Sequence, residues 1–170
     1  VNFLSKRKTW MTISKQNALK QKFIHAGMLN AKKRIFSWLY NPNSTDVKVD
    51  KIYDRKILKD MYFDKVLGKV YTQFGREIDA DEDHAISYII QSTAADLVFE
   101  QMYKVWGFLE DKKSFVKFCN HDSLVIDLSE EDQYDINKIS KLFSNTRFGK
   151  MKVNHEGGKN WSDMKPLHIK

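Results

Sequence analysis

The chain has 170 residues, a net charge of +7 and a hydrophobic content of 42%, which fits one domain with an appended subdomain and excludes a disordered chain. No apolar run approaches about 18 residues, and residues 1–12 lack the apolar stretch of a signal peptide, so we expect no membrane span and a cytoplasmic location. Cys119 is the one cysteine, which excludes an internal disulfide and a metal site built on paired cysteines.

The first third of the chain is predicted to be largely helical. Residues 1–12 mix apolar and basic groups without a clear period, so we expect them to be extended or irregular. Residues 14–40 have a helical pattern that we expect to break near Gly27, and Pro42 disfavours helix at the residue before it. Residues 50–67 predict another amphipathic helix.

The remainder of the chain is predicted to mix strands and helices. We expect a strand over residues 70–74, a long buried helix over 81–109 and a hairpin of two strands over 115–119 and 124–127. A helix over 129–143 and a last strand over 151–153 are expected to follow. This order predicts an α+β fold, in which helices back an antiparallel sheet.

Basic residues are concentrated at the N-terminal end of the chain. Residues 1–45 contain nine of the 29 Lys and Arg residues and none of the 22 Asp and Glu residues. Such asymmetry favours a polyanionic partner, most simply a nucleic acid. A basic solvated face without a ligand is the alternative.

A polar turn between two short apolar strands presents His121 and Asp122. A carboxylate held at the tip of a hairpin is rigid and faces solvent, which suits a metal ligand in phosphoryl transfer. The alternative is an ordinary turn, because Asn, Asp and Ser all favour turns.

A basic helix and a glutamine are further candidate binding groups. Lys32, Phe36 and Tyr40 lie at positions i, i+4 and i+8, so they form one ridge that could grip a triphosphate and stack on a base. An ordinary helix surface over a core is the alternative. Gln91 lies in the long helix, where burial would oblige it to bond either a nucleic-acid groove or a backbone carbonyl.

Five segments resemble the motifs of family A DNA polymerases, the group of bacterial DNA polymerase I and many phage replicases. They are residues 31–40, similar to the fingers motif Lys-x-x-x-Phe-x-x-x-Tyr; 72–76, similar to the Gly-Arg turn; 91–96, similar to Gln-Gly-Thr-Ala-Ala-Asp; 121–123, similar to His-Asp-Glu; and 151–161, similar to a closing strand with its Gly-x-Asn-Trp tail. The resemblance runs from about Asn30 to Lys165.

The resemblance implies a partial polymerase palm, which is an antiparallel sheet with a β-hairpin backed by a long helix, together with a helical fingers subdomain. The implied divisions are a basic, partly helical N-terminal segment over 1–26, fingers-like helices over 27–67 and the C-terminal palm over 68–170.

The resemblance also implies a reaction and residue roles. The reaction is template-directed attack of a primer 3′-OH on a dNTP, with Mg²⁺, or Mn²⁺ in its place, stabilising charge. Asp122 would be the catalytic, metal-binding residue. The other implied contacts are Lys32, Phe36 and Tyr40 with the nucleotide, and Lys33, Arg34, Arg76, Gln91 and His121 with DNA.

Some positions depart from the family pattern. Met28 replaces an Arg, Asn41 a Gly, Ser87 an Asn and Ser123 the Glu of His-Asp-Glu. Motif A, which carries the other metal-binding aspartate, precedes the fingers motif in this family, yet no Asp or Glu precedes Asp46.

We therefore expect a fragment or split subunit of a polymerase, from a bacterium or a phage-infected cell, that is inactive alone. The expected partners are a DNA primer–template, a dNTP and an upstream polypeptide that carries motif A and the thumb. The alternative is a non-enzymatic nucleic-acid-binding module derived from a palm. Self-association is a further expectation, because a partial palm exposes a sheet edge and apolar surface.

Overall fold

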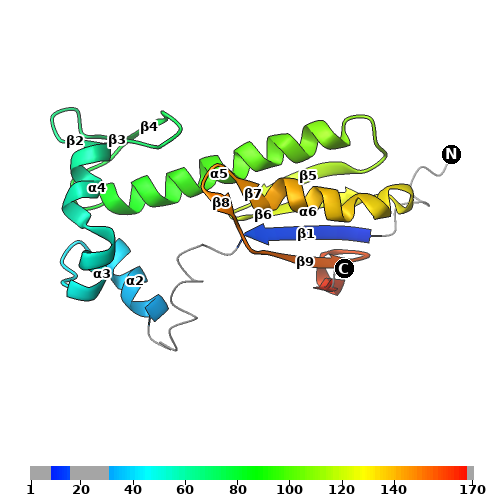
Figure 1. Cartoon of the computed structure of the whole chain (residues 1–170), viewed down its shortest axis with the longest axis horizontal. Helices are drawn as coiled ribbons and strands as arrows, with labels where there is room; N and C mark the ends of the chain where they lie inside the picture. The colour runs from blue at the N-terminus through cyan, green and yellow to red at the C-terminus, as the bar shows by residue number, and fades with distance from the viewer. Residues whose placement is uncertain (1–8, 16–30, 168–170) are drawn as a thin grey trace. The chain divides into compact units, whose positions relative to one another are not determined.

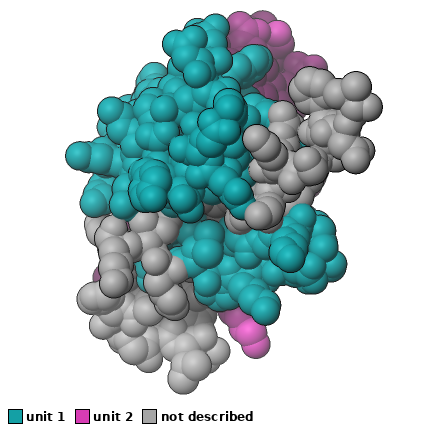
Figure 2. Space-filling model, turned by 90° about the vertical axis from the view of Figure 1, so that its right-hand side faces the viewer, with its two compact units in different colours: residues 1–18, 97–170 teal, residues 19–96 magenta. Residues whose placement is uncertain are grey.

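The computed structural model describes residues 9–15 and 31–167. Two compact units make up the chain: unit 1 comprises Val1–Ala18 and Leu97–Lys170, and unit 2 comprises Leu19–Asp96 (Figure 2). The expectations for residues 1–8 and 16–30, which include the helix break at Gly27 and the departure at Met28, lie outside the described residues. The predicted α+β class is confirmed.

Unit 1 contains an antiparallel sheet of five strands (Figure 1). Its order is β10 (Lys165–Pro166), β9 (Val153–Gly158), β1 (Thr9–Lys15), β6 (Ser123–Leu128) and β5 (Phe115–Asn120). The hairpin predicted at 115–127 is confirmed as β5 and β6, whereas the last strand begins at Val153 rather than at 151.

β1 lies at the centre of this sheet, between β6 and β9. The predicted extended or irregular chain over residues 1–12 agrees with a strand at residues 9–12, whereas the helix predicted from residue 14 is wrong for residues 14 and 15. The segment reads Thr-Trp-Met-Thr-Ile-Ser-Lys, so β-branched and aromatic residues give it strand propensity over a stretch too short for a clear period.

Two helices cover one face of the sheet. The long helix is confirmed as α5 (Ala85–Leu109), and α6 (Ile136–Ser144) follows the sheet strands. Both contribute to the core of unit 1, which contains Val98, Val105, Leu109, Leu124, Ile126, Leu128, Ile139 and Phe143. Every residue of β6 is buried, so its side chains are closely packed on both faces of the sheet.

The helix predicted from Ser129 is only partly an α-helix. Glu130–Asp135 form a 3₁₀-helix, η1, before α6 begins at Ile136. Ser129 caps η1, as its Oγ accepts from the backbone N–H of Glu131 at 3.4 Å. Asp132 accepts a hydrogen bond from the Ser114 backbone N–H at 2.7 Å.

The part of unit 2 that the structure describes, from residue 31 on, contains three helices before α5 and a small sheet. They are α2 (Ala31–Tyr40), α3 (Val47–Tyr53) and α4 (Arg55–Tyr62), followed by β2 (Phe63–Asp64), β3 (Lys69–Tyr71) and β4 (Glu77–Asp79). The single helix predicted over 50–67 is wrong, because Asp54 adopts a left-handed φ of 37° and caps α4 by accepting from the Ile57 N–H. The core of these helices contains Ile35, Trp38, Val49 and Ile86.

The remaining elements are short. β7 (Asn145–Thr146) and β8 (Gly149–Lys150) form a hairpin, and Trp161–Asp163 form a 3₁₀-helix, η2. The strand predicted at 70–74 ends at Tyr71, and a turn with Gly75 at φ 80° follows. Among the helices of the described chain, none is long and apolar enough to cross a membrane.

Candidate active site and nucleic-acid interface

The turn between β5 and β6 consists of His121 and Asp122, since Asn120 and Ser123 are paired across the hairpin. His121 has a left-handed φ of 51°, a conformation that His, Asn and Asp adopt more readily than most residues. The Ser123 hydroxyl donates to the Asn120 carbonyl at 2.7 Å and closes the turn. His121 and Asp122 are both exposed, so the predicted presentation of this pair to solvent is confirmed.

The backbone around Asp122 is fixed by pairing on both sides of β6. β5 pairs with one edge of β6 and β1 with the other. In the β1–β6 register Ser14 lies opposite Ser123, and one step further places Lys15 opposite Asp122. The neighbouring strand end therefore brings a lysine, and no carboxylate, to the backbone position beside Asp122.

A single carboxylate does not complete a site for two metal ions, which share carboxylates about 3.5–4 Å apart. Over the part of the chain that the structure describes, no three His, Cys, Asp or Glu side chains come together in a way that could hold a metal ion. Asp122 can contribute one oxygen ligand, and the remaining ligands of a two-ion site are not supplied by the described residues of unit 1.

In unit 2, α2 brings together two of the three residues of the predicted nucleotide ridge. The rings of Phe36 and Tyr40 stack with centroids 5.7 Å apart and planes 9° apart. Tyr40 is 51% exposed, so this stack presents an aromatic face to solvent. Lys32 lies one helical turn before Phe36 on the backbone of α2, and Lys33 is exposed.

Arg34 is engaged within unit 2. Its Nε and Nη2 each donate to the Asp46 carboxylate at 2.5 Å, and Asp46 also accepts from the backbone N–H groups of Lys48 and Val49 at the start of α3. The hydrogen bonds from Arg34 hold the pKa of the Asp46 carboxyl below its ordinary value. The guanidinium therefore joins α2 to α3, and a DNA contact by Arg34 would have to compete with this ion pair.

Arg76 is engaged in a similar way. Its Nε donates to the Asp96 Oδ1 on α5 at 2.8 Å, and its Nη2 donates to the Ser92 carbonyl at 3.3 Å. Gln91 lies beside this contact and is exposed, so the expectation that it is buried is wrong, while it remains free to meet a ligand. Asp96 Oδ2 and Thr93 Oγ1 are buried and have no hydrogen-bond partner.

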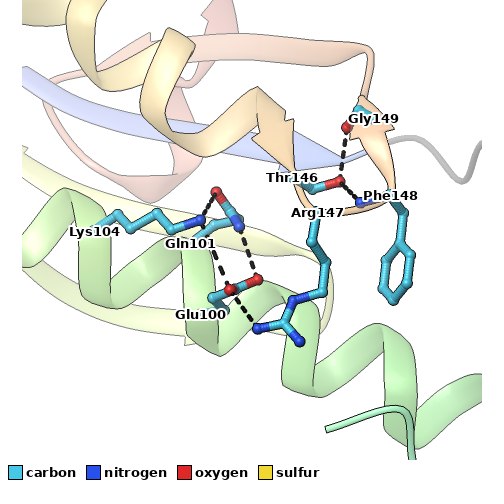
Figure 3. Close-up of polar contacts among 7 residues, drawn as sticks. All are labelled: Glu100, Gln101, Lys104, Thr146, Arg147, Phe148 and Gly149. Carbon is cyan, nitrogen blue, oxygen red and sulfur yellow. Dashed lines mark hydrogen bonds and ion pairs between the residues drawn. The ribbon is translucent and has the colours of Figure 1, made fainter.

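Unit 1 contains a polar network that the sequence analysis did not identify (Figure 3). Arg147, at the tip of the β7–β8 hairpin, donates to Glu100 Oε1 at 2.8 Å. Gln101 is fully buried; it donates to Glu100 and accepts from Lys104 at 3.4 Å. The network fixes the hairpin to α5, and the pKa of Glu100 is lowered chiefly by the hydrogen bond from Arg147.

DNA polymerases are among the known proteins to which this chain is similar. No family model matches the chain. Over 93 residues, 52% of its length, it is 32% identical to a DNA polymerase I of Borreliella burgdorferi. The polymerase domain of Pol1 from M. smegmatis, solved in complex with DNA primer-template and dNTP, matches 92% of the chain with a TM-score of 0.66 and 16% identity. The chain is similar to a portion of a family A DNA polymerase.

The polymerase-like resemblance and the partial palm and fingers fold are thereby confirmed. The chain spans 10% of the Borreliella enzyme and 40% of the M. smegmatis chain. The predicted divisions at residues 26 and 67 differ from the compact units, since β2, β3, β4 and the first half of α5 group with the fingers-like helices. The roles that the resemblance implies for individual residues of this chain stay predictions.

Proposed function

We propose that the chain is the fingers and palm portion of a template-directed DNA polymerase, which binds primer–template DNA and does not extend a primer by itself. The observation that carries this proposal is Asp122, exposed at the tip of a hairpin that is paired on both sides in a polymerase-like sheet. The complex of the M. smegmatis neighbour with DNA primer-template and dNTP supports these ligands as the ones to test.

The residues divide between two tasks under this proposal. Lys32, with the stacked rings of Phe36 and Tyr40, would hold the triphosphate, sugar and base of a dNTP. The exposed side chains of His121, Gln91 and Lys33 would contact primer and template. Arg34 and Arg76 would support these contacts through their ion pairs.

Mg²⁺ would stabilise the negative charge that develops in phosphoryl transfer, and Mn²⁺ could replace it. The donor set fits one contact to such an ion through Asp122 and does not fit a two-ion site. The missing carboxylate would come from an upstream polypeptide that also carries the thumb.

A non-enzymatic nucleic-acid-binding module is the second candidate, and the pairing of β6 favours it. β1 already occupies the edge of β6 away from β5, and its sequence contains no Asp or Glu. A strand from another polypeptide could pair with β6 only by displacing β1. A complementing carboxylate would therefore have to approach Asp122 from outside the sheet.

One experiment tests both candidates. Fluorescence anisotropy of a labelled primer–template would measure DNA affinity, and denaturing gels would measure primer extension with Mg²⁺ and with Mn²⁺. We expect salt-sensitive binding and no extension. Extension by the wild-type chain but not by Asp122→Ala would show that a second carboxylate is present, and absence of DNA binding would overturn the proposal.

Addition of the next complementary dNTP separates the two candidates. In a polymerase portion, the complementary dNTP with Mg²⁺ should tighten DNA binding more than a mismatched dNTP, and Lys32→Ala should remove the difference. In a binding module, neither nucleotide should change the affinity. Lys56→Ala, an exposed lysine on α4, is the matched control.

A further inference from the structure

An aromatic pair joins Trp161, the last residue of the Gly-x-Asn-Trp tail, to Phe118, which belongs to none of the five motif-like segments. Phe118 on β5 and Trp161 in η2 have ring centroids 5.9 Å apart and planes 34° apart. Phe118 is 45% exposed and Trp161 is 54% exposed. The two rings therefore contact each other and still present much of their surface to solvent, although they are more than 40 positions apart in the sequence.

Phe118 lies on the face of the sheet away from the helices. Cys119, the next residue, has its Sγ 3.1 Å from Sδ of Met102 on α5, and its partner Leu124 belongs to the core beneath the helices. Successive side chains of a strand point to opposite faces, so Phe118 and its partner Val125 point the other way. The aromatic pair marks that second face of the sheet.

The turn that presents Trp161 is fixed without a ligand. Asn160 Oδ1 accepts from the backbone N–H of Ser162 at 3.0 Å, and its amide donates to Asp163 Oδ2 at 2.6 Å. A Cβ at Gly158 would lie 2.7 Å from the backbone carbonyl carbon of Asp163, so only glycine permits this close fold-back. A ligand that stacks on Trp161 therefore meets a ring whose position is already set, which lowers the entropic cost of binding.

The pair is close to the candidate active-site turn. Phe118 lies on β5 three positions before His121, the first residue of the turn, or roughly 10 Å at the rise of a β-strand. That distance corresponds to about three base steps of a stacked strand. Lys117 and Lys159, each within two positions of one of the rings, are exposed and supply positive charge beside them. Aromatic rings with neighbouring basic groups are the usual means of binding a single strand without sequence preference.

We propose that Phe118 and Trp161 form a stacking platform for the bases of a nucleic-acid strand that passes the His121–Asp122 turn. The platform rests on the proposed function, because the proposal assumes that the nucleic-acid strand ends at the hairpin of β5 and β6. It adds a base-binding subsite, independent of nucleic-acid sequence, and gives Trp161 and Phe118 a role that the motif resemblance does not imply.

The experiment compares DNA affinities of the full chain and its variants by fluorescence anisotropy. The probes are a labelled twelve-nucleotide oligothymidylate and an oligomer of the same length whose central positions are abasic. Trp161→Ala should weaken binding of the oligothymidylate about tenfold, the effect typical of losing one base–aromatic stack. Trp161→Phe should retain most of the affinity for the oligothymidylate. The wild-type chain and Trp161→Ala should bind the abasic oligomer with equal affinity.

Matched controls separate stacking from loss of fold. Trp106→Ala removes an exposed tryptophan of α5 and should leave affinity unchanged. If Trp161→Ala unfolds, the DNA affinities of Trp161→Leu and Trp161→Phe are compared instead. Leucine covers the same protein surface but has no aromatic face on which a base could stack. Wild-type affinity in Trp161→Ala or in Trp161→Leu would overturn the platform and leave the proposed function standing. An equal loss on the abasic probe would also overturn it, whereas failure of the wild-type chain to bind any DNA would overturn both proposals.

Discussion

Arg76 donates to the carboxylate of Asp96 across 2.8 Å and thereby joins the turn after β3 to the middle of α5. The two residues are twenty positions apart, and the same guanidinium also reaches the Ser92 carbonyl next to Gln91. The pair therefore positions the exposed Gln91, which gives Arg76 a structural task within unit 2.

Substitution of Arg76 should lower stability. Arg76→Ala leaves the Asp96 carboxylate, 12% exposed, without its partner, and we expect a loss of about 1–3 kcal/mol in the free energy of unfolding. Thermal or urea unfolding measures this loss. Lys69→Ala, which removes the exposed Lys69–Glu77 ion pair, is the control and should cost about 1 kcal/mol or less. Unchanged stability with weaker DNA binding would instead favour a direct DNA contact.

The Arg34–Asp46 pair should make the fold sensitive to acid. The pKa of Asp46 is lower in the folded chain than its ordinary value, so the folded state gains stability from the ionised form above that ordinary value. This stability is lost as the pH falls below about 4 and through the lowered pKa. Asp46→Asn keeps a capping side chain for α3 and removes the charge.

Melting temperatures of the wild-type chain and of Asp46→Asn should therefore differ near neutral pH and converge in acid. Asp83→Asn, at an exposed carboxylate, is the control and should follow the wild type at every pH. A constant difference between wild type and Asp46→Asn down to pH 2 would contradict the prediction.

His155 should produce a second pH dependence at a higher pH. Its Nε2 lies 2.8 Å from the Ser140 hydroxyl, and burial lowers its pKa in the folded chain. The unfolded chain therefore binds a proton more readily, so stability is complete above about pH 6.5 and falls as the pH drops below it. His155→Gln should reduce the loss of melting temperature between pH 7.5 and pH 5. An unaltered pH profile in that variant would assign the effect to another group.

A second carboxylate beside Asp122 should create a metal site. Lys15 lies opposite Asp122 when the β1–β6 register is continued one step beyond Ser14 and Ser123, so Lys15→Asp places a carboxylate at the end of β1 beside the turn that holds Asp122. Like charges directly opposite each other destabilise a strand pair by roughly 0.2–1 kcal/mol, and a bound divalent ion would cancel this repulsion. We expect Mn²⁺ to raise the melting temperature of Lys15→Asp more than that of the wild type or of Lys15→Asn. An equal response of all three would show that Asp122 does not direct a ligand to this position.

The hairpin and α5 could be predicted from the sequence, because their apolar patterns match what they bury. β6 contains the apolar run Leu124–Ile126, and α5 is rich in apolar residues over its 25 residues, so the sequence marks both segments as buried. The break at Asp54 could not be predicted, since a left-handed φ at a residue other than glycine depends on its local hydrogen bonds.

The partners of the basic side chains could not be predicted either. The carboxylates that hold Arg34 and Arg76 lie twelve and twenty positions away along the chain. Only the tertiary fold brings each arginine to its carboxylate. From the sequence alone, both arginines were therefore predicted to be available for DNA binding. β1 was missed because its importance comes from its neighbours β6 and β9, which lie more than 100 positions away.

The irregularity in β5 has a consequence for how the protein behaves at high concentration. β5 is an outer strand of the five-stranded sheet, and its register with β6 shifts between Val116 and Phe118, with Lys117 at the shift. A bulge and a lysine on an outer strand both hinder the addition of another strand. Copies of this chain should therefore resist fibril growth along β5.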